Sequence, residues 1–244
     1  MIFDLFKSKP KLKELIPKDY VDIHSHILPG IDDGAKNVKE SIKLISKLKE
    51  LNFSKIICTP HTYPNVYNNT NQTILSSFNT LRKELNTDIK VDYASEYMLD
   101  DNLLERAQNK NLLTIKANYV LVEMSYISAP ANLFEIIFHL QMNGYIPVLA
   151  HPERYIFLIN SIKILERLKD IGVKFQLNLL SCTGYYGKNI MQFSDKILKL
   201  NFIDFVGSDI HNLNHINQIS KRKVKIKEIK KLEAAISKNI FFKN

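Results

Sequence analysis

Side chains that can bind metal ions stand at the ends of apolar runs in this sequence. The set comprises His24 and His26 in DIHSH, His61 in TPH, Glu96 in SEY, Glu123 in LVEM, His151 in AHPER, and Asp209 and His211 in SDIH. A His-x-His pair on a strand places both imidazoles on one face, because side chains alternate with a period of two. Imidazole and carboxylate together suit Zn, Mn or Fe, and one tetrahedral zinc needs only four ligands. The eight side chains therefore predict a site with two or three metal ions, which is typical of phosphatases and nucleases.

A structural role explains a single histidine or carboxylate at a strand end more often than metal binding does. The same role does not explain eight of them at the same end of successive strands. Two other histidines differ from this set, because His139 lies in a helical pattern and His215 in a polar loop. We expect both of these to be structural.

Two further groups could complete such a site. Arg154 stands three residues after His151, and a guanidinium suits bidentate capture of a phosphate oxyanion. The alternative for Arg154 is a surface salt bridge with Glu153 or Glu166. A tight loop between two glycines carries Asp32 and Asp33, either of which could bind a third metal ion, unless they serve only the turn or a helix N-terminus.

Other catalytic chemistries lack their residues. A cysteine-dependent tyrosine phosphatase needs Arg six positions after Cys, but those positions hold Pro64 and Lys188 after Cys58 and Cys182. Only two cysteines in 244 residues form no disulfide framework, so we expect both to be reduced. The nucleophile elbow G-x-S-x-G, the Rossmann fingerprint and the P-loop are also missing from the sequence.

Alternating strands and helices must position these side chains. Continuous apolar runs such as YVLVEM and IPVLAH are typical of parallel strands that are buried on both faces. The expected strands are Val21–Ile27, Lys55–Thr59, Ile89–Ser95, Tyr119–Met124, Ile146–Ala150, Lys174–Leu180 and Phe202–Gly207. The expected helices are Asn37–Leu51, with Asn37 and Glu40 at capping-box spacing, Thr73–Leu85, Ala131–Asn143, Ile156–Lys169, Ile190–Leu200 and Val224–Lys238. This pattern predicts an α/β barrel of TIM type or a seven-stranded relative, in which the active site lies at the carboxyl ends of the strands; a doubly wound open sheet is the alternative.

The formal net charge of +9 belongs to the two ends of the chain. Residues 1–18 carry five Lys against two acids, residues 221–231 carry seven cations against one acid, and the remaining charges cancel. A neutral body disfavours nucleic acid as a partner, since nucleic-acid binding needs a basic stripe on the binding face. We expect the basic ends to be solvated helix faces, with docking to an acidic partner or a membrane surface as the alternative.

Composition and length place the chain among ordinary globular proteins. The sequence is 45% hydrophobic and 24% charged over 244 residues, and no Pro/Gly/Ser-rich linker divides it. We expect a single domain over residues 1–244, with residues 1–18 as an N-terminal extension and residues 221–244 as a basic C-terminal helix. In the extension, we expect Phe3, Leu5, Phe6 and Leu12 to cap the barrel, with contact to a partner as the alternative. No apolar run reaches the length of a membrane span and the start has no signal-peptide pattern, so we expect a cytoplasmic protein.

Six segments together resemble a known family. They are DIHSHILPGIDDGA (22–35), TPH (59–61), SEY (95–97), LVEM (121–124), AHPER (150–154) and SDIH (208–211). These segments resemble the polymerase-and-histidinol-phosphatase (PHP) superfamily, and more narrowly its capsular-polysaccharide tyrosine-protein phosphatases, the CpsB/CapC group. Two positions depart from the pattern of the group: Thr62 stands where a second His often follows TPH, and the segment SCTGYYG (181–187) differs from the expected one.

The resemblance implies a distorted seven-stranded TIM-like (β/α)7 barrel, the PHP fold, with a trinuclear site that is often manganese-dependent; Fe or Zn are alternatives. It implies that Arg154 binds the phosphate of phosphotyrosine. It assigns His24 and His26 with Asp209 to the first metal, Glu123 or Glu96 as a bridge to a second metal held with His151, and Asp33, His61 and His211 to the third.

We therefore predict a metal-dependent protein-tyrosine phosphatase, a phosphoric monoester hydrolase that uses a metal-bound hydroxide. The resemblance implies that its partner is a bacterial tyrosine kinase that governs capsule or exopolysaccharide synthesis. One alternative is a phosphoesterase that acts on a small phosphate monoester of the histidinol-phosphate type or on nucleic acid. The other alternative is a non-catalytic metal-binding regulator.

Overall fold

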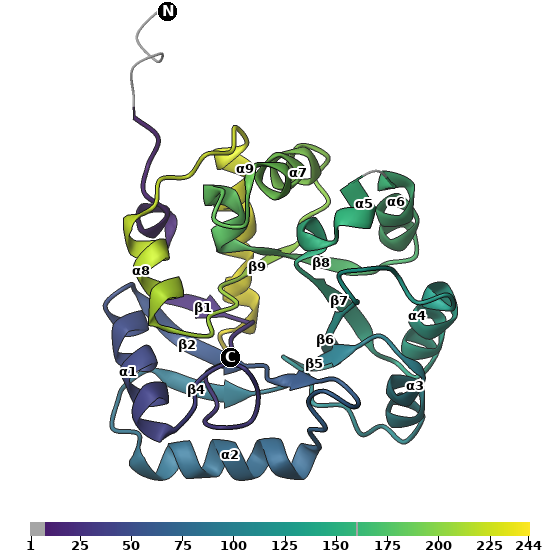
Figure 1. Cartoon of the computed structure of the whole chain (residues 1–244), viewed down its shortest axis with the longest axis horizontal. Helices are drawn as coiled ribbons and strands as arrows, with labels where there is room; N and C mark the ends of the chain where they lie inside the picture. The colour runs from purple at the N-terminus through teal and green to yellow at the C-terminus, as the bar shows by residue number, and fades with distance from the viewer. Residues whose placement is uncertain (1–7, 160) are drawn as a thin grey trace, which may run out of the picture.

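Short parallel strands alternate with helices along the chain (Figure 1). The computed structural model describes residues 8–159 and 161–244. Its strands are β1 (Tyr20–Asp22), β2 (Phe53–Cys58), β3 (His61–Thr62), β4 (Lys90–Tyr93), β5 (Glu96–Met98), β6 (Tyr119–Glu123), β7 (Ile146–Ala150), β8 (Lys174–Asn178) and β9 (Phe205–Gly207). Its α-helices are α1 (Val38–Lys49), α2 (Asn71–Glu84), α3 (Asp101–Gln108), α4 (Leu133–Met142), α5 (Ile156–Ile159), α6 (Ile162–Asp170), α7 (Lys188–Lys199), α8 (Leu213–Lys221) and α9 (Ile229–Lys238). Four 3₁₀ segments complete these elements: η1 (Leu12–Leu15), η2 (Pro152–Arg154), η3 (Leu179–Thr183) and η4 (Asn239–Phe242).

The strands form two sheets. Two strand positions are interrupted, and each of them contributes its first segment to one sheet and its second segment to the other. One sheet has the order β1-β2-β4 and the other the order β3-β5-β6-β7-β8-β9, with every strand pair in the described residues parallel. Strand β3 continues the line of β2 after Thr59 and Pro60, and β5 continues β4 after Ala94 and Ser95. Pro60 has no N–H to donate to a neighbouring strand, which accounts for one interruption. Seven strand positions therefore follow one another in chain order, as expected.

The first and last strands meet along a seam. Beyond their regular segments, Ser25 and Ile210 form a parallel bridge, and the Asp209 N–H donates to the carbonyl of His24 at 2.8 Å. At the opposite end of β9, the buried side chain of Asn239 accepts from the Val206 N–H at 3.1 Å. Its amide nitrogen donates to the carbonyls of Val206 (2.7 Å) and Val21 (2.9 Å). A single asparagine thus satisfies backbone groups of both β1 and β9.

Apolar side chains on the two faces of the strands fill two cores. The larger core lies between the strands and the helices that surround them in Figure 1. The smaller core comes from alternate strand residues on the other face, among them Val21, Ile57, Leu121, Val148 and Phe205. Burial on both faces accounts for the continuous apolar runs in the sequence.

Helix boundaries follow local capping. The predicted cap at Asn37 is confirmed, because its side chain accepts from the Glu40 N–H at 3.0 Å. The reciprocal half of the box is different, since the Glu40 carboxylate accepts from the Lys36 N–H. Helices α3 and α8 were not predicted; each has an Asx cap, Asp100 or Asn212, but only two buried residues.

Two predictions about the chain ends need correction or limits. The expected helix Val224–Lys238 begins only at Ile229, because Val224 lies in an extended stretch whose N–H donates to the carbonyl of Pro10. Leu12 is fully buried, whereas Phe3, Leu5 and Phe6 lie outside the described residues. In residues 8–159 and 161–244, no helix has both the length and the apolar character that crossing a bilayer requires.

Candidate metal centre

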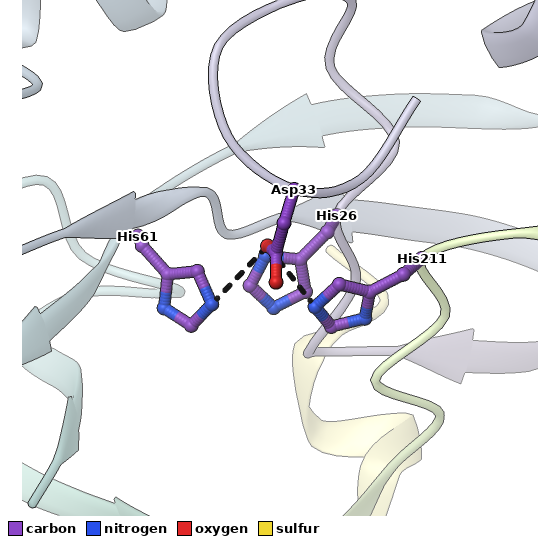
Figure 2. Close-up of side chains that lie close together, drawn as sticks. All are labelled: His26, Asp33, His61 and His211. Carbon is purple, nitrogen blue, oxygen red and sulfur yellow. Dashed lines mark ion pairs between the residues drawn. The ribbon is translucent and has the colours of Figure 1, made fainter. Parts of the chain in front are cut away.

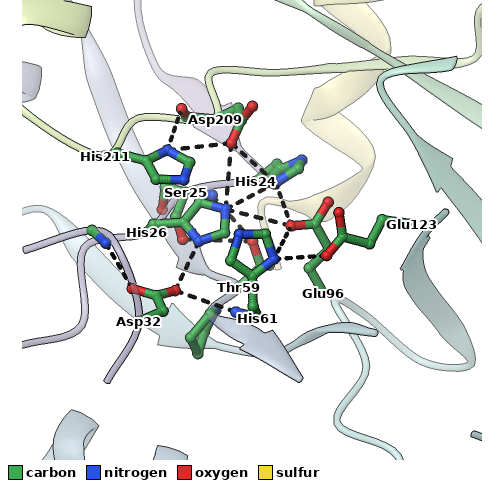
Figure 3. A network of polar contacts seen from close by, with 12 residues as sticks. His24, Ser25, His26, Asp32, Thr59, His61, Glu96, Glu123, Asp209 and His211 are labelled. Atoms are coloured by element: carbon green, nitrogen blue, oxygen red, sulfur yellow. Dashed lines mark hydrogen bonds and ion pairs between the residues drawn. The ribbon is translucent and has the colours of Figure 1, made fainter. Parts of the chain in front are cut away.

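The strand ends and one loop bring all nine predicted metal ligands close together; Asp33 is exposed and the other eight are buried or partly buried. Figure 3 shows seven of them, His24, His26, His61, Glu96, Glu123, Asp209 and His211. His24 and His26 follow β1, and Asp209 and His211 follow β9 across the seam. The others come from the intervening strand ends and one loop: His61 opens β3, Glu96 opens β5, Glu123 ends β6, His151 follows β7, and Asp33 lies in the loop before α1. The carboxyl ends of parallel strands meet at one edge, which explains the convergence.

One group of possible ligands comprises His26, Asp33, His61 and His211 (Figure 2). The Oδ1 atom of Asp33 lies 3.5 Å from His61 Nε2 and 3.4 Å from His211 Nε2. The figure shows this carboxylate pointing between the two rings. The structure thus groups Asp33, His61 and His211 as the resemblance implied and adds His26.

Glu96 connects the remaining groups. Its Oε2 atom lies 3.1 Å from His61 Nδ1, 3.2 Å from His24 Nε2 and 3.5 Å from His26 Nε2. Its Oε1 atom lies 3.1 Å from His151 Nε2. Three further groups with ligand atoms close together are His24, His151 and Asp209; His24, His26 and Glu96; and His61, Glu96 and Glu123. His151 therefore lies close to Asp209 as well as to Glu96, whereas the resemblance assigned Asp209 to the first metal and His151 to the second.

Neighbouring acceptors fix which nitrogen of each histidine points into the network. Gln176 Oε1 lies 2.7 Å from His24 Nδ1, and Asp32 Oδ2 lies 2.8 Å from His26 Nδ1. The Nε2 atoms of the two rings face one another across 3.2 Å. In the neutral form that binds metal, with Nδ1 donating, each ring would present its Nε2 lone pair at this point. Asp209 Oδ1 lies 3.4 Å and 3.3 Å from the same two Nε2 atoms. Acceptors therefore converge on one point, an arrangement that a bound cation stabilises.

This donor chemistry fits divalent metal ions. Glu96 Oε2 is fully buried and has no hydrogen-bond donor among the described residues. Buried carboxylates require a compensating cation, and Arg154 is the only Arg or Lys that forms an ion pair with this network in the described part of the chain. Mixed imidazole and carboxylate donors suit Mn, Fe and Zn.

The charges of the network act on one another. Burial alone would raise the pKa of Glu96, yet the imidazoles of His24 and His61 hold it well below its usual value. Burial raises the pKa of neighbouring Glu123, and the charge of Glu96 raises it further. Burial also lowers the pKa of His151 to about 4, so its ring is neutral at pH 7 and able to bind a metal ion.

Backbone geometry at the network is unusual. His151 has φ 34° and Asp209 has φ 51°, a region that residues other than glycine rarely adopt and that is enriched at functional sites. A Cβ on Gly34 would lie 1.9 Å from the carbonyl oxygen of His26. Only glycine at this position therefore lets the loop with Asp32 and Asp33 lie directly over the histidines.

Arg154 lies at the edge of the network rather than in a surface pair with Glu153 or Glu166. Its Nη1 atom donates to Asp209 Oδ2 at 2.5 Å. The guanidinium lies between two aromatic rings, 5.0 Å from the Tyr126 centroid and 4.5 Å from the Tyr186 centroid. These contacts hold a planar cation beside the predicted metal ligands, where a phosphate group can reach it.

Several supporting residues were not predicted. Gln176 and Asn178 lie on β8, the strand for which no ligand was expected; the Asn178 amide donates to Asp209 Oδ2 at 2.9 Å. The sequence left open whether Asp32 or Asp33 binds a metal ion. In the structure, the Asp32 carboxylate orients His26 and accepts from the backbone N–H of His61. A polar residue on an otherwise apolar strand, as in FQLN, is the signal that could have identified Gln176. Cys58 and Cys182 are buried and free, as expected.

We expect Gln176→Ala to weaken metal binding by about 10- to 100-fold, because His24 loses the acceptor that fixes its ring. Isothermal titration with Mn²⁺ on protein first freed of metal measures this change. Gln141→Ala on α4, remote from the network, is the control and should bind metal like the wild type. Unchanged affinity in the Gln176 variant would show that His24 needs no such partner.

Comparison with known proteins identifies the family. Residues 20–244 match the family model described as capsular polysaccharide synthesis, CpsB/CapC. The chain belongs to the CpsB/CapC family. It is 31% identical over 201 residues to the putative tyrosine-protein phosphatase CapC of Staphylococcus aureus. The aligned region covers 80% of this chain and 78% of that protein.

Solved structures agree with the CpsB/CapC assignment. A chain from the crystal structures of YwqE from Bacillus subtilis and CpsB from Streptococcus pneumoniae, described as unique metal-dependent tyrosine phosphatases, matches with TM-score 0.76 and 30% identity. The match covers 82% of this chain and 84% of that one. An amidohydrolase from Mycoplasma synoviae matches with TM-score 0.51 at 13% identity over 96% of this chain and 86% of its own, which concerns the fold alone. The predicted family and the distorted barrel-type α/β fold are confirmed.

Proposed function

We propose that this chain is a metal-dependent protein-tyrosine phosphatase that hydrolyses phosphotyrosine. One observation carries the proposal: Arg154 is held between two tyrosine rings beside a network of nine predicted metal ligands, most of them buried. The CpsB/CapC relatives are named tyrosine-protein phosphatases, and the similar solved structures are described as metal-dependent. A purely regulatory metal site would not need a guanidinium at its open edge.

The nine side chains would hold two or three divalent ions, and we propose Mn²⁺ as the physiological metal, with Fe and Zn as alternatives. The ligands are His24, His26, Asp33, His61, Glu96, Glu123, His151, Asp209 and His211. The chemistry that such ions supply when bound is a lower pKa for water and compensation of charge on a phosphoryl group. For this role, Gln176 orients the ring of His24 and Asp32 orients the ring of His26.

Arg154 would bind the phosphate through two parallel N–H donors. This geometry matches two oxygens of an anionic phosphate and disfavours a neutral group. The rings that flank it offer a surface for the tyrosyl ring of the substrate. Tyr126 is 44% exposed and lies beside Arg154, so its ring would offer an aromatic leaving group an apolar contact. This favours phosphotyrosine over phosphoserine, which has no ring.

The test compares substrates on one metal-loaded preparation. With Mn²⁺ present, we expect a phosphotyrosyl peptide to be hydrolysed with higher kcat/KM than histidinol phosphate or single-stranded DNA. Addition of a chelator should abolish turnover, and Mn²⁺ should restore it better than Fe²⁺ or Zn²⁺. A preference for histidinol phosphate or DNA would overturn the proposal in favour of the corresponding phosphoesterase.

We further propose a bacterial tyrosine kinase in the cytoplasm as the phosphotyrosine partner, acting in capsule or exopolysaccharide synthesis. Support comes from the family description, capsular polysaccharide synthesis. Phosphotyrosine profiling of cells with and without the enzyme tests this proposal. The kinase should gain phosphotyrosine when the enzyme is removed, and an unchanged kinase would contradict it.

A further inference from the structure

The two basic ends of the chain lie side by side. The Leu12 N–H donates to the carbonyl of Arg222, and the Val224 N–H donates to the carbonyl of Pro10, both at 2.9 Å. Lys11 and Lys223 form an antiparallel bridge between the same stretches. Figure 1 shows the purple N-terminal stretch beside the yellow-green chain after α8. The pairing gathers lysines from both stretches into one basic surface, which comprises Lys9, Lys11, Lys13, Lys221, Lys223, Lys225 and Lys227.

The extended backbone turns these lysines outward. Val224 and Ile226 are fully buried, while the alternate residues Lys223, Lys225 and Lys227 are exposed. None of the seven lysines of the basic surface forms an ion pair with a described Asp or Glu. The nearby Asp195 carboxylate instead accepts from the backbone N–H of Lys227 at 2.7 Å. Lys9 is engaged within the surface, since its Nζ atom donates to the carbonyls of Lys225 and Ile226. The other six cations are available to a partner with negative charge.

A chain of contacts joins the basic surface to the candidate site. Arg154 lies 4.5 Å from the Tyr186 ring, the Tyr186 and Tyr185 rings lie 4.8 Å apart, and Arg222 lies 5.3 Å from the Tyr185 ring. Lys225 sits over the same loop, because a Cβ on Gly184 would lie 3.7 Å from its Nζ atom. These three steps place the Arg222 guanidinium no more than about 15 Å from that of Arg154, which an extended peptide spans with at most about four to five residues.

We propose that the basic surface docks an acidic stretch of the phosphoprotein substrate that begins within about four to five residues of the phosphotyrosine. This inference rests on the proposed function, because the phosphotyrosine must occupy the site beside Arg154. An acidic peptide fits better than a membrane, since the lysines continue into the aromatic edge of the site. Docking by such exposed charges raises the association rate and weakens with salt.

The test uses the full chain and two double variants with equal charge change. Lys223→Glu/Lys225→Glu reverses the centre of the basic surface, whereas Lys83→Glu/Lys163→Glu reverses exposed lysines on α2 and α6 that are outside it. The substrates are a phosphotyrosyl peptide with three Glu at the stated spacing, the same peptide with Gln in place of Glu, and para-nitrophenyl phosphate.

We expect the wild type and the control to prefer the Glu peptide by about tenfold in kcat/KM at low salt, mainly through KM. The Lys223/Lys225 variant should lose this preference, and 0.5 M NaCl should remove it from the wild type. Turnover of para-nitrophenyl phosphate should be equal in all three proteins. Fluorescence anisotropy with the unphosphorylated Glu peptide should show the same loss of binding.

The outcomes separate this inference from the proposed function. Equal kcat/KM for the Glu and Gln peptides in the wild type would overturn the docking surface and leave the phosphatase intact. Failure to hydrolyse either peptide would overturn the phosphatase, while the anisotropy measurement would still decide whether the surface binds acidic peptide. Binding of the wild type, but not the variant, to anionic phosphatidylserine vesicles without any peptide preference would assign the surface to a membrane instead.

Discussion

Replacing Asp209 with asparagine is expected to lower kcat/KM for a phosphotyrosyl peptide by about 10³- to 10⁴-fold, or about 4–5.5 kcal/mol in transition-state stabilisation. This carboxylate has two functions at once. Its Oδ1 atom lies within 3.4 Å of His24 Nε2 and His26 Nε2, and its Oδ2 atom accepts from Arg154. The substitution removes a negative charge from the predicted metal ligands and the anchor of the guanidinium together.

Metal content and activity must be measured on the same protein. We expect the Asp209 variant to bind less Mn²⁺ by elemental analysis and to keep its helical circular dichroism. Asp170→Asn, an exposed change on α6, should retain both metal and activity. An Asp209→Asn protein with full metal content and near-normal turnover would contradict the role given to this residue.

Arg154→Ala should reduce kcat/KM by about 10²- to 10³-fold while the metal content stays at the wild-type level. The reason is the loss of a planar donor pair for the phosphate, which binds more tightly as charge develops in the transition state. Arg154→Lys should recover little activity, because a single ammonium cannot make two parallel hydrogen bonds and does not stack between Tyr126 and Tyr186 in the same way.

The pattern of loss distinguishes phosphate binding from a merely structural role. Arg167→Ala, which removes an exposed guanidinium from the ring of Phe134 on the outer helices, is the matched control and should leave kcat/KM unchanged. If Arg154→Ala lowers metal content in proportion to activity, then its effect acts through Asp209. Full activity with full metal content would show that the phosphate does not contact Arg154.

The sequence predicted the strand positions well because buried parallel strands leave a direct signal. Runs such as IPVLA are apolar on both faces, and Ile146–Ala150 was predicted to the residue. The breaks at Pro60 and Ser95 were not predicted, since the short segments β3 and β5 carry the ligands themselves and read as polar loop. The helix start at Ile229 was missed because Val224 and Ile226 are buried in an extended stretch by the chain's other end.

The types of side chain at the candidate site were predictable from the sequence, but their division into groups around individual metal ions was not. Side chains that could bind a metal ion are recognisable from residue type and from their position at strand ends, and the structure brings the nine predicted ones close together. Their role as ligands stays a prediction. Which atom faces which depends on tertiary contacts far apart in sequence. Gln176 orients His24 across 152 positions, and nothing local to either residue indicates this. Likewise, the different positions of the Asp32 and Asp33 side chains at the site depend on the close packing of Gly34 against the His26 backbone.

The seam between β1 and β9 is built from contacts between residues that are far apart in the chain. Neighbouring strands elsewhere are close in sequence, but the seam joins Ser208 to Asp22 across 186 positions and Asn239 to Tyr20 across 219. Loop-closure entropy makes such contacts the slowest to form. We therefore expect the seam, which brings His24 and Asp209 together, to close late during folding. Metal binding across these two residues would stabilise the closed state by mass action, so that a loaded chain opens at the seam less often than an unloaded one.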